Sequence, residues 1–262
     1  MQEENLAFDL EWDDTNVLPA LVYPDTAFVF HKMTQVTLDM AQSRQGFHVL
    51  DIGCGRGIDA AIVDKNGARV VGLEPSKIMI SKARDLLASR HPDGVGVHLV
   101  RGLGEELPFR SDSFDVVVCK GALDHFFDPM RSVREMRRIL QPEGVAIIAL
   151  ANYESLSCKL AKAIHFFLTP ASFRRIEIMP IWETPPDHTY KFDYLRLMCL
   201  VGTQFEVVEC RGVSLLWCFP GWGRLLSSLS PNLSAIILHI LDRIAARLPL
   251  ISDVIVVKLK PL

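Results

Sequence analysis

The chain has 262 residues, of which 49% are hydrophobic and 23% charged, as expected for a globular protein with a self-sufficient core. Its net charge of -3 comes without a block of lysine and arginine, which argues against nucleic-acid binding. The six cysteines form no CxxC pair and no zinc-ligand spacing, so we expect reduced thiols, no metal site and a cytoplasmic location. The acidic start lacks the basic and apolar regions of a signal peptide.

The first 45 residues are predicted to form an N-terminal segment that includes a lid helix. Residues 1–20 are acidic, and we expect them to be loosely ordered. Residues 24–45 start with Pro-Asp-Thr, a plausible helix start, and apolar side chains then recur at helical spacing. Those side chains are Phe30, Met33, Val36 and Met40. His31 lies on the same predicted helix and is one candidate for a site residue.

From residue 46 onward, short β-branched runs alternate with helical stretches. The runs end in turn residues, as strands of a sheet covered on both faces do. This alternation predicts crossover units and a Rossmann-like, doubly wound α/β sheet that is mostly parallel. The predicted strands occupy residues 48–53, 68–74, 95–102, 114–121 and 144–151.

The C-terminal part of the chain breaks this rhythm twice. Residues 152–190 are rich in proline, and residues 214–250 are strongly apolar and partly helical. We expect both to be insertions on the substrate side of a domain that covers residues 46–262. Strands are predicted at 205–213 and 253–260, and they would give the sheet an antiparallel C-terminal edge.

A glycine loop follows the first predicted strand, in the run Asp51-Ile52-Gly53-Cys54-Gly55-Arg56-Gly57. Its spacing differs from the G-x-G-x-x-G of dinucleotide sites. Glu74 ends the second strand, where an acid accepts hydrogen bonds from the ribose of an adenosine ligand. An acid at Asp51 suits a cationic ligand better than a pyrophosphate. The pattern therefore favours S-adenosylmethionine, which carries an ammonium and a sulfonium, over a nicotinamide dinucleotide.

Several ordered motifs resemble one family. VLDIGCGRG, LEPSKIMISKAR, RGLGEELPFRSDSFDVVVCKGALDHFFDP and ILQPEGVAII are similar to segments of class I S-adenosylmethionine-dependent methyltransferases, in the small-molecule branch that includes quinone C-methyltransferase-like enzymes. The similarity covers roughly residues 46–151 and has a weaker echo later in the chain. It implies S-adenosylmethionine as cofactor and methyl transfer to a small-molecule or lipid-like acceptor.

The resemblance also implies a cofactor-binding set. The glycine loop would line the methionine end, Glu74 would hold the ribose, and the segments that follow would border the adenine. Leu103 departs from the family pattern, since an acid often contacts the adenine amino group there; Glu105 is a candidate substitute. The predicted set comprises Asp51, Gly53, Cys54, Gly55, Gly57, Glu74, Pro75, Ser76, Leu103, Gly104, Glu105 and Lys120.

Candidate catalytic residues follow the fourth strand. Asp124 and His125 lie in KGALDHFFDP, where residues face the reactive end of the cofactor in this architecture. Histidine titrates near neutrality and suits removal of an acceptor proton. His188 is a second histidine candidate. For each, the alternative is a structural hydrogen-bonding role.

Residues 213–250 contain no unbroken apolar run long enough to span a bilayer. One interpretation is a helical insertion that packs on the sheet, closes over the substrate or forms a dimer contact. The other is an apolar cap that admits a hydrophobic acceptor or touches a bilayer through Trp217, Phe219 and Trp222. The oligomeric state is not predicted. Two alternative functions stay open: a catalytically silent methyltransferase-like binding module and a nicotinamide-dependent oxidoreductase.

Overall fold

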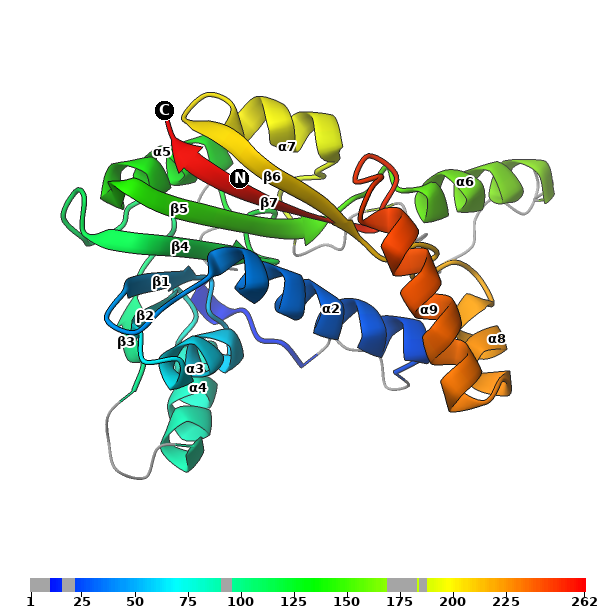
Figure 1. The fold of residues 1–262 in the computed structure, drawn as a ribbon, viewed down its shortest axis with the longest axis horizontal. Helices are drawn as coiled ribbons and strands as arrows, with labels where there is room; N and C mark the ends of the chain where they lie inside the picture. Colours follow the sequence, from blue (N-terminus) through cyan, green and yellow to red (C-terminus); the bar gives the residue numbers. More distant parts are fainter. Residues whose placement is uncertain (1–9, 16–21, 91–95, 169–182, 184–187) are drawn as a thin grey trace.

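The structure, a computed structural model, describes residues 10–15, 22–90, 96–168, 183 and 188–262 (Figure 1). Seven strands form one sheet in the order β3-β2-β1-β4-β5-β7-β6. Helices cover both faces, with α2 and α3 on one and α5 and α7 on the other (Figure 1). The strands are β1 His48–Ile52, β2 Arg69–Glu74, β3 His98–Arg101, β4 Phe114–Lys120, β5 Leu140–Ala151, β6 Phe205–Val213 and β7 Val254–Pro261.

The helices alternate with the strands in the first two thirds of the chain and cluster after β5 and β6. In the described part of the chain they are α2 Pro24–Ala41, α3 Ile58–Lys65, α4 Lys77–Arg90, α5 Pro129–Ile139, α6 Leu156–Leu168, α7 Tyr194–Val201, α8 Trp222–Ser228 and α9 Pro231–Ala245. None of these helices is long and apolar enough to cross a membrane.

The predicted sheet is confirmed. Strands β1 to β5 pair in parallel, while β7 pairs antiparallel with both β5 and β6. The antiparallel strand therefore lies one position in from the edge, which β6 occupies. The long excursion between β6 and β7 allows the last strand to insert between β5 and β6.

The core forms two layers because alternate residues of each strand face opposite sides of the sheet. On β4, Val117 and Cys119 pack in the cluster that contains α5 and α7. Their neighbours Val116 and Val118 pack instead with α2 and α3. Both sides of β4 are buried, which explains its uninterrupted apolar sequence.

Helix α2 confirms the predicted helix, although it ends at Ala41, before a left-handed Gln42. Its buried side chains, Val29, Met33, Val36 and Met40, pack against one face of the sheet. The helix is thus part of the core on that face, and it also lines the cavity described below. The division of the chain into residues 1–45 and 46–262, with insertions at 152–190 and 214–250, stays a prediction. Much of the first insertion lies outside the described residues.

Candidate functional site

A cavity of about 690 Å³ lies at the carboxyl ends of β1, β2 and β4, the edge at which doubly wound sheets bind ligands. Its volume is within the range of small-molecule sites. It is lined by the glycine loop, the residues after β2 and β4, the first half of α2, and two residues near the N-terminus. The predicted residues on its wall are Asp51, Gly53, Cys54, Gly55, Glu74, Pro75, Leu103, Gly104, Glu105, Lys120 and His125.

The glycine loop is held against β2 by its own backbone. The amides of Gly53 and Cys54 both donate to the carbonyl of Leu73, at 2.8 and 3.0 Å. Gly53 has φ +69, and a Cβ atom there would lie 2.4 Å from the Cβ of Ala122. Glycine is therefore required, because the loop bends sharply and passes against the segment that follows β4.

Glu74 braces the loop from the neighbouring strand. Its Oε2 accepts a hydrogen bond from the amide of Gly55, and its Oε1 accepts one from the amide of Ser76, both at 3.0 Å. Burial raises the pKa of Glu74, and these two hydrogen bonds lower it in part. Each carboxylate oxygen keeps acceptor capacity, so the residue is able to accept ribose hydroxyls while it positions the loop.

Asp51 is a buried acid at the entrance to the loop. Burial raises its pKa to about 8; the carboxylate of Asp59 also raises it, and Lys120 lowers it. Lys120 pairs with Asp59 at 2.7 Å and donates to the hydroxyl of Thr34 on α2 at 2.6 Å. The lysine is thus engaged by Asp59 and Thr34. A ligand cation beside Asp51 would relieve this unfavourable burial of negative charge.

The charged side chains on the cavity wall suit a cationic nucleoside. Acidic side chains on its wall outnumber the basic ones, Arg56 and Lys120. The acids are Asp14, Asp51, Asp59, Glu74 and Glu105. A pyrophosphate would meet this negative wall at a cost, whereas an ammonium and a sulfonium would be attracted to it.

Leu103, Gly104 and Glu105 form the part of the wall that the resemblance assigns to the adenine. A Cβ on Gly104 would lie 2.6 Å from the ring of Phe126, so glycine permits that ring to pack closely. Glu105 accepts hydrogen bonds from the amides of Phe127 and Asp128, at 2.7 and 3.3 Å. This explains its burial; its role as a substitute for the missing acid at Leu103 stays a prediction.

Four predicted residues do not line the cavity. Gly57, in a left-handed conformation, is the N-cap of α3, and the Ser76 hydroxyl accepts from the amide of Met79 in the first turn of α4. Asp124 and His188 adjoin His125, which is on the wall. His31 also lies on the wall, on α2.

Asp124, His125 and His188 meet although they are distant in sequence. The Nε2 atom of His188 lies 3.1 Å from Oδ2 of buried Asp124, and the two imidazole rings have centroids 4.3 Å apart. The amides of Thr189 and Tyr190 also donate to the Asp124 carbonyl. Burial alone would raise the pKa of Asp124, but the hydrogen bond and charge of His188, with His125, lower it below its usual value. Asp124 is therefore an ionised acceptor that orients His188.

The donor atoms of these three residues all lie within 4.8 Å of one another, a grouping that a metal ion also accepts. Sequence spacing gave no sign of it, because His188 is far along the chain. The absence of a metal site stays a prediction.

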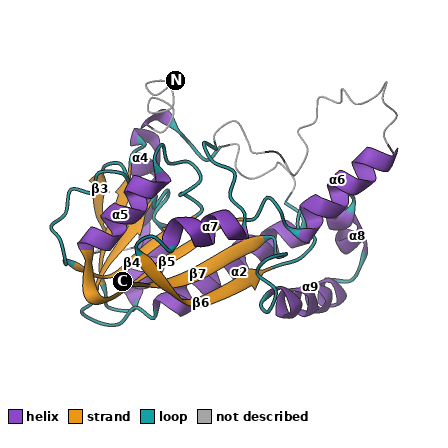
Figure 2. Cartoon of the chain, turned by 90° about the horizontal axis from the view of Figure 1, so that it is seen from above, coloured by secondary structure: helices purple, strands orange, loops and turns teal. Residues whose placement is uncertain are grey.

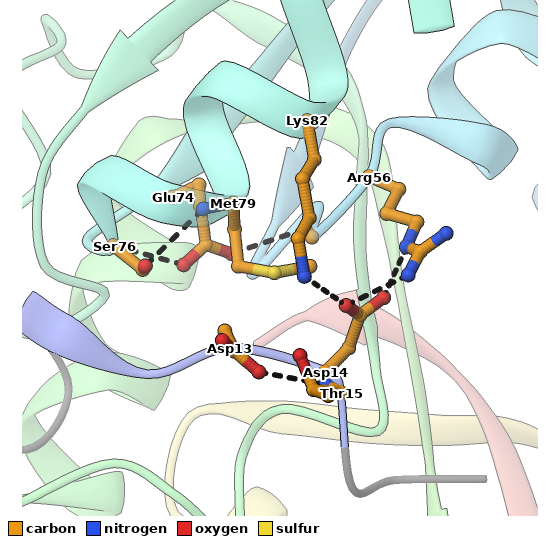
Figure 3. Close-up of polar contacts among 9 residues, drawn as sticks. Asp13, Asp14, Thr15, Arg56, Glu74, Ser76, Met79 and Lys82 are labelled. Carbon is orange, nitrogen blue, oxygen red and sulfur yellow. Dashed lines mark hydrogen bonds and ion pairs between the residues drawn. The ribbon is translucent and has the colours of Figure 1, made fainter.

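Residues near the N-terminus complete the cavity wall, and sequence reasoning missed them. Trp12 and Asp14 both line the cavity. The Asp14 carboxylate pairs with Arg56 of the glycine loop and, at 2.7 Å, with Lys82 of α4 (Figure 3). The hydroxyl of Ser76 donates to the Trp12 carbonyl. This part of the expected loose segment therefore makes specific contacts. The sequence offered one signal for these contacts, because Trp12 lies among acidic residues.

Part of the chain is similar in sequence to known methyltransferases. Residues 50–148 match the family described as "Methyltransferase domain". The chain is 34% identical over 104 residues to an uncharacterized methyltransferase of Bacillus subtilis, covering 40% of each chain. It is 31% identical over 136 residues to a ubiquinone biosynthesis O-methyltransferase of Xanthomonas campestris, covering 50% of this chain and 55% of that one. The chain thus spans about half or less of the length of these two relatives.

Solved structures share the fold. A protein of Pyrococcus horikoshii matches with a TM-score of 0.61 and 17% identity, covering 96% of this chain and all of that one. A S-adenosylmethionine-dependent methyltransferase of Aquifex aeolicus matches with a TM-score of 0.56 and 11% identity, over 100% and 99% of the two chains. Residues 50–148 therefore form a methyltransferase domain of the S-adenosylmethionine-dependent kind, and S-adenosylmethionine is the cofactor of that family. The predicted family resemblance and the predicted cofactor are confirmed.

Proposed function

We propose that this protein transfers a methyl group from S-adenosylmethionine to a hydrophobic small molecule. The observation that carries the proposal is one cavity whose wall combines acidic and apolar side chains. The acidic side chains at and beside the glycine loop suit the cationic cofactor. The apolar ones include Ala27 and Phe30 of α2, together with Ile58 and Ile62 of α3.

The apolar part of the cavity wall favours a lipid-like acceptor. Apolar side chains bury a ligand but make no directional hydrogen bonds with it. His125, on the same wall, is a polar group that would orient an acceptor hydroxyl. Two relatives support this class of acceptor by their names, a ubiquinone biosynthesis O-methyltransferase and a 2-methyl-6-phytyl-1,4-hydroquinone methyltransferase. We therefore propose a phenol or hydroquinone with an apolar substituent.

The bound cofactor supplies a methyl group that is already activated, so the protein's task is orientation and exclusion of water. Asp51 and Glu74 would fix the cofactor. The cofactor would supply the methyl group and leave as S-adenosylhomocysteine, and a ring nitrogen of His125 would take the proton that the acceptor hydroxyl gives up. Asp124 and His188 would act as positioning residues, because His188 is held by Asp124 and its ring lies against that of His125.

The test is a methylation assay with a short-chain prenylated hydroquinone and isotopically labelled cofactor. His125→Ala should lower turnover by roughly 10²–10⁴-fold, the contribution of a general base, and leave cofactor affinity near normal. His98→Ala, an exposed histidine on β3, is the matched control and should leave turnover unchanged. A chelator should also leave turnover unchanged if His125 acts as a base.

Unchanged turnover in His125→Ala would remove the base from the proposal. Cofactor binding without a methylated product across phenols, amines and carbon acids would favour the silent binding module instead. Binding of a nicotinamide dinucleotide in place of S-adenosylmethionine would favour the oxidoreductase.

A further inference from the structure

Helix α9 exposes a continuous row of large apolar side chains. Leu233, Ile236, Ile240 and Ile244 follow one another at intervals of three and four residues, which places them along one face of the helix. Ile236 is 55% exposed and Ile240 is 50% exposed. The opposite face, with Leu238, Asp242 and Ala245, is buried. We call these four exposed residues the α9 stripe.

The segment that contains α8 and α9 carries exposed charges of one sign. Between residues 214 and 250, the exposed charged side chains are Arg224, Arg243 and Arg247. The acid of this segment, Asp242, is buried and faces Lys32 and Arg211 at 3.8 and 3.6 Å. This segment is therefore basic, although the chain as a whole has a net charge of -3.

The neighbouring helices repeat this combination. Leu225 on α8 is exposed, and so are Leu160, Ile164 and Phe166 on α6, a helix that contains two lysines and no acid. Both ribbon views place α6, α8 and α9 at the same end of the molecule (Figures 1 and 2). Exposed apolar residues and basic residues therefore gather at one end.

This end adjoins the cavity. A Cβ on Gly223 of α8 would lie 2.6 Å from Tyr23 and 3.0 Å from Asp25, so α8 packs tightly on the start of α2. The rings of Phe28 on α2 and His239 on α9 have centroids 5.1 Å apart. The next turns of α2 carry Ala27 and Phe30, which line the cavity wall.

We infer that α8 and α9 bind the surface of an anionic lipid bilayer. An amphipathic helix with an exposed apolar face bordered by arginines lies at the interface, with its apolar side chains below the headgroups and its cations among them. The α9 stripe provides the apolar face, and the cations are Arg224, Arg243 and Arg247. The sequence placed such a contact on Trp217, Phe219 and Trp222; these are half-buried, and the ring of Trp217 packs against Phe30. This inference does not depend on methyl transfer.

Vesicle co-sedimentation tests the inference. The full chain should bind vesicles that contain phosphatidylglycerol and should bind phosphatidylcholine vesicles much more weakly. Ile236→Ser with Ile240→Ser should abolish binding. Arg243→Ala with Arg247→Ala should weaken it by roughly 30-fold at low ionic strength, and added salt should reproduce that loss.

Leu195→Ser is the matched control, because Leu195 is 65% exposed but lies on α7. It should bind vesicles as the unchanged chain does. Binding of S-adenosylhomocysteine by each variant shows that it is folded and keeps the vesicle result separate from the proposed activity. The inference is overturned if the unchanged chain ignores anionic vesicles or if the double isoleucine variant still binds them. It is also overturned if light scattering shows that the unchanged chain is a dimer with and without vesicles and that the double isoleucine variant is a monomer.

Discussion

Asp51 is an acid whose charged form the cofactor-free fold disfavours. Its folded-state pKa of about 8 lies well above its ordinary value of 3.8, because the side chain is buried beside another acid. The folded state thus keeps a proton that the unfolded state releases. The free energy of unfolding should fall as pH rises from about 4 to about 8, and bound cofactor should restore it.

Asp51→Asn should therefore stabilise the cofactor-free protein. The advantage of the variant in free energy of unfolding should grow between pH 5 and pH 8 by roughly 3 to 4 kcal/mol, as measured by urea denaturation. Asp112→Asn, at an exposed turn, is the control and should show no such pH dependence. An Asp51→Asn advantage that is equal at both pH values would contradict the raised pKa.

The segment at residues 12–14 acts at the scale of an element, since it joins the glycine loop to α4 across the cavity wall (Figure 3). Arg56 and Lys82 both lower the pKa of Asp14 through hydrogen bonds and charge. Because these side chains are partly exposed, each pair should contribute little alone. Together they fix the segment next to the place where the cofactor is expected.

Asp14→Ala should speed the release of S-adenosylhomocysteine by roughly 2- to 10-fold, because the cover over the cavity loses both ion pairs. Stopped-flow tryptophan fluorescence, to which Trp12 on the cavity wall contributes, would measure the release rate. Asp13→Ala is the matched control, since the Asp13 carboxylate accepts from the Thr15 amide within its own turn. Equal rates in the two variants would show that Asp14 does not retain the ligand.

Local features of the sequence predicted most elements correctly. The strand runs, the glycine turn at Gly53 and the acid at Glu74 are encoded within a few residues of each other. Three features were not predicted: the insertion of β7 between β5 and β6, the closure of the wall by Trp12 and Asp14, and the contact of His188 with Asp124. Each depends on residues far apart in the chain, and no local propensity or spacing encodes such pairings.

At the scale of the whole molecule, the cavity shares helix α2 with the end that carries the exposed apolar residues. The glycine loop lies at the carboxyl edge of the sheet, α2 lines the same cavity, and α8 and α9 pack on the start of α2. A hydrophobic acceptor held in a bilayer would thus lie close to the helix that lines the cavity. This arrangement links the proposed acceptor class to the inferred lipid surface.

Calorimetric titration with S-adenosylhomocysteine tests the central claim, that the acidic cavity binds this nucleoside. The folded chain should bind one equivalent with a dissociation constant between about 1 µM and 1 mM, Asp51→Asn should bind at least roughly tenfold more weakly, and a nicotinamide dinucleotide should give no heat. Absence of heat with both S-adenosylhomocysteine and S-adenosylmethionine, on protein shown to be folded, would contradict the account.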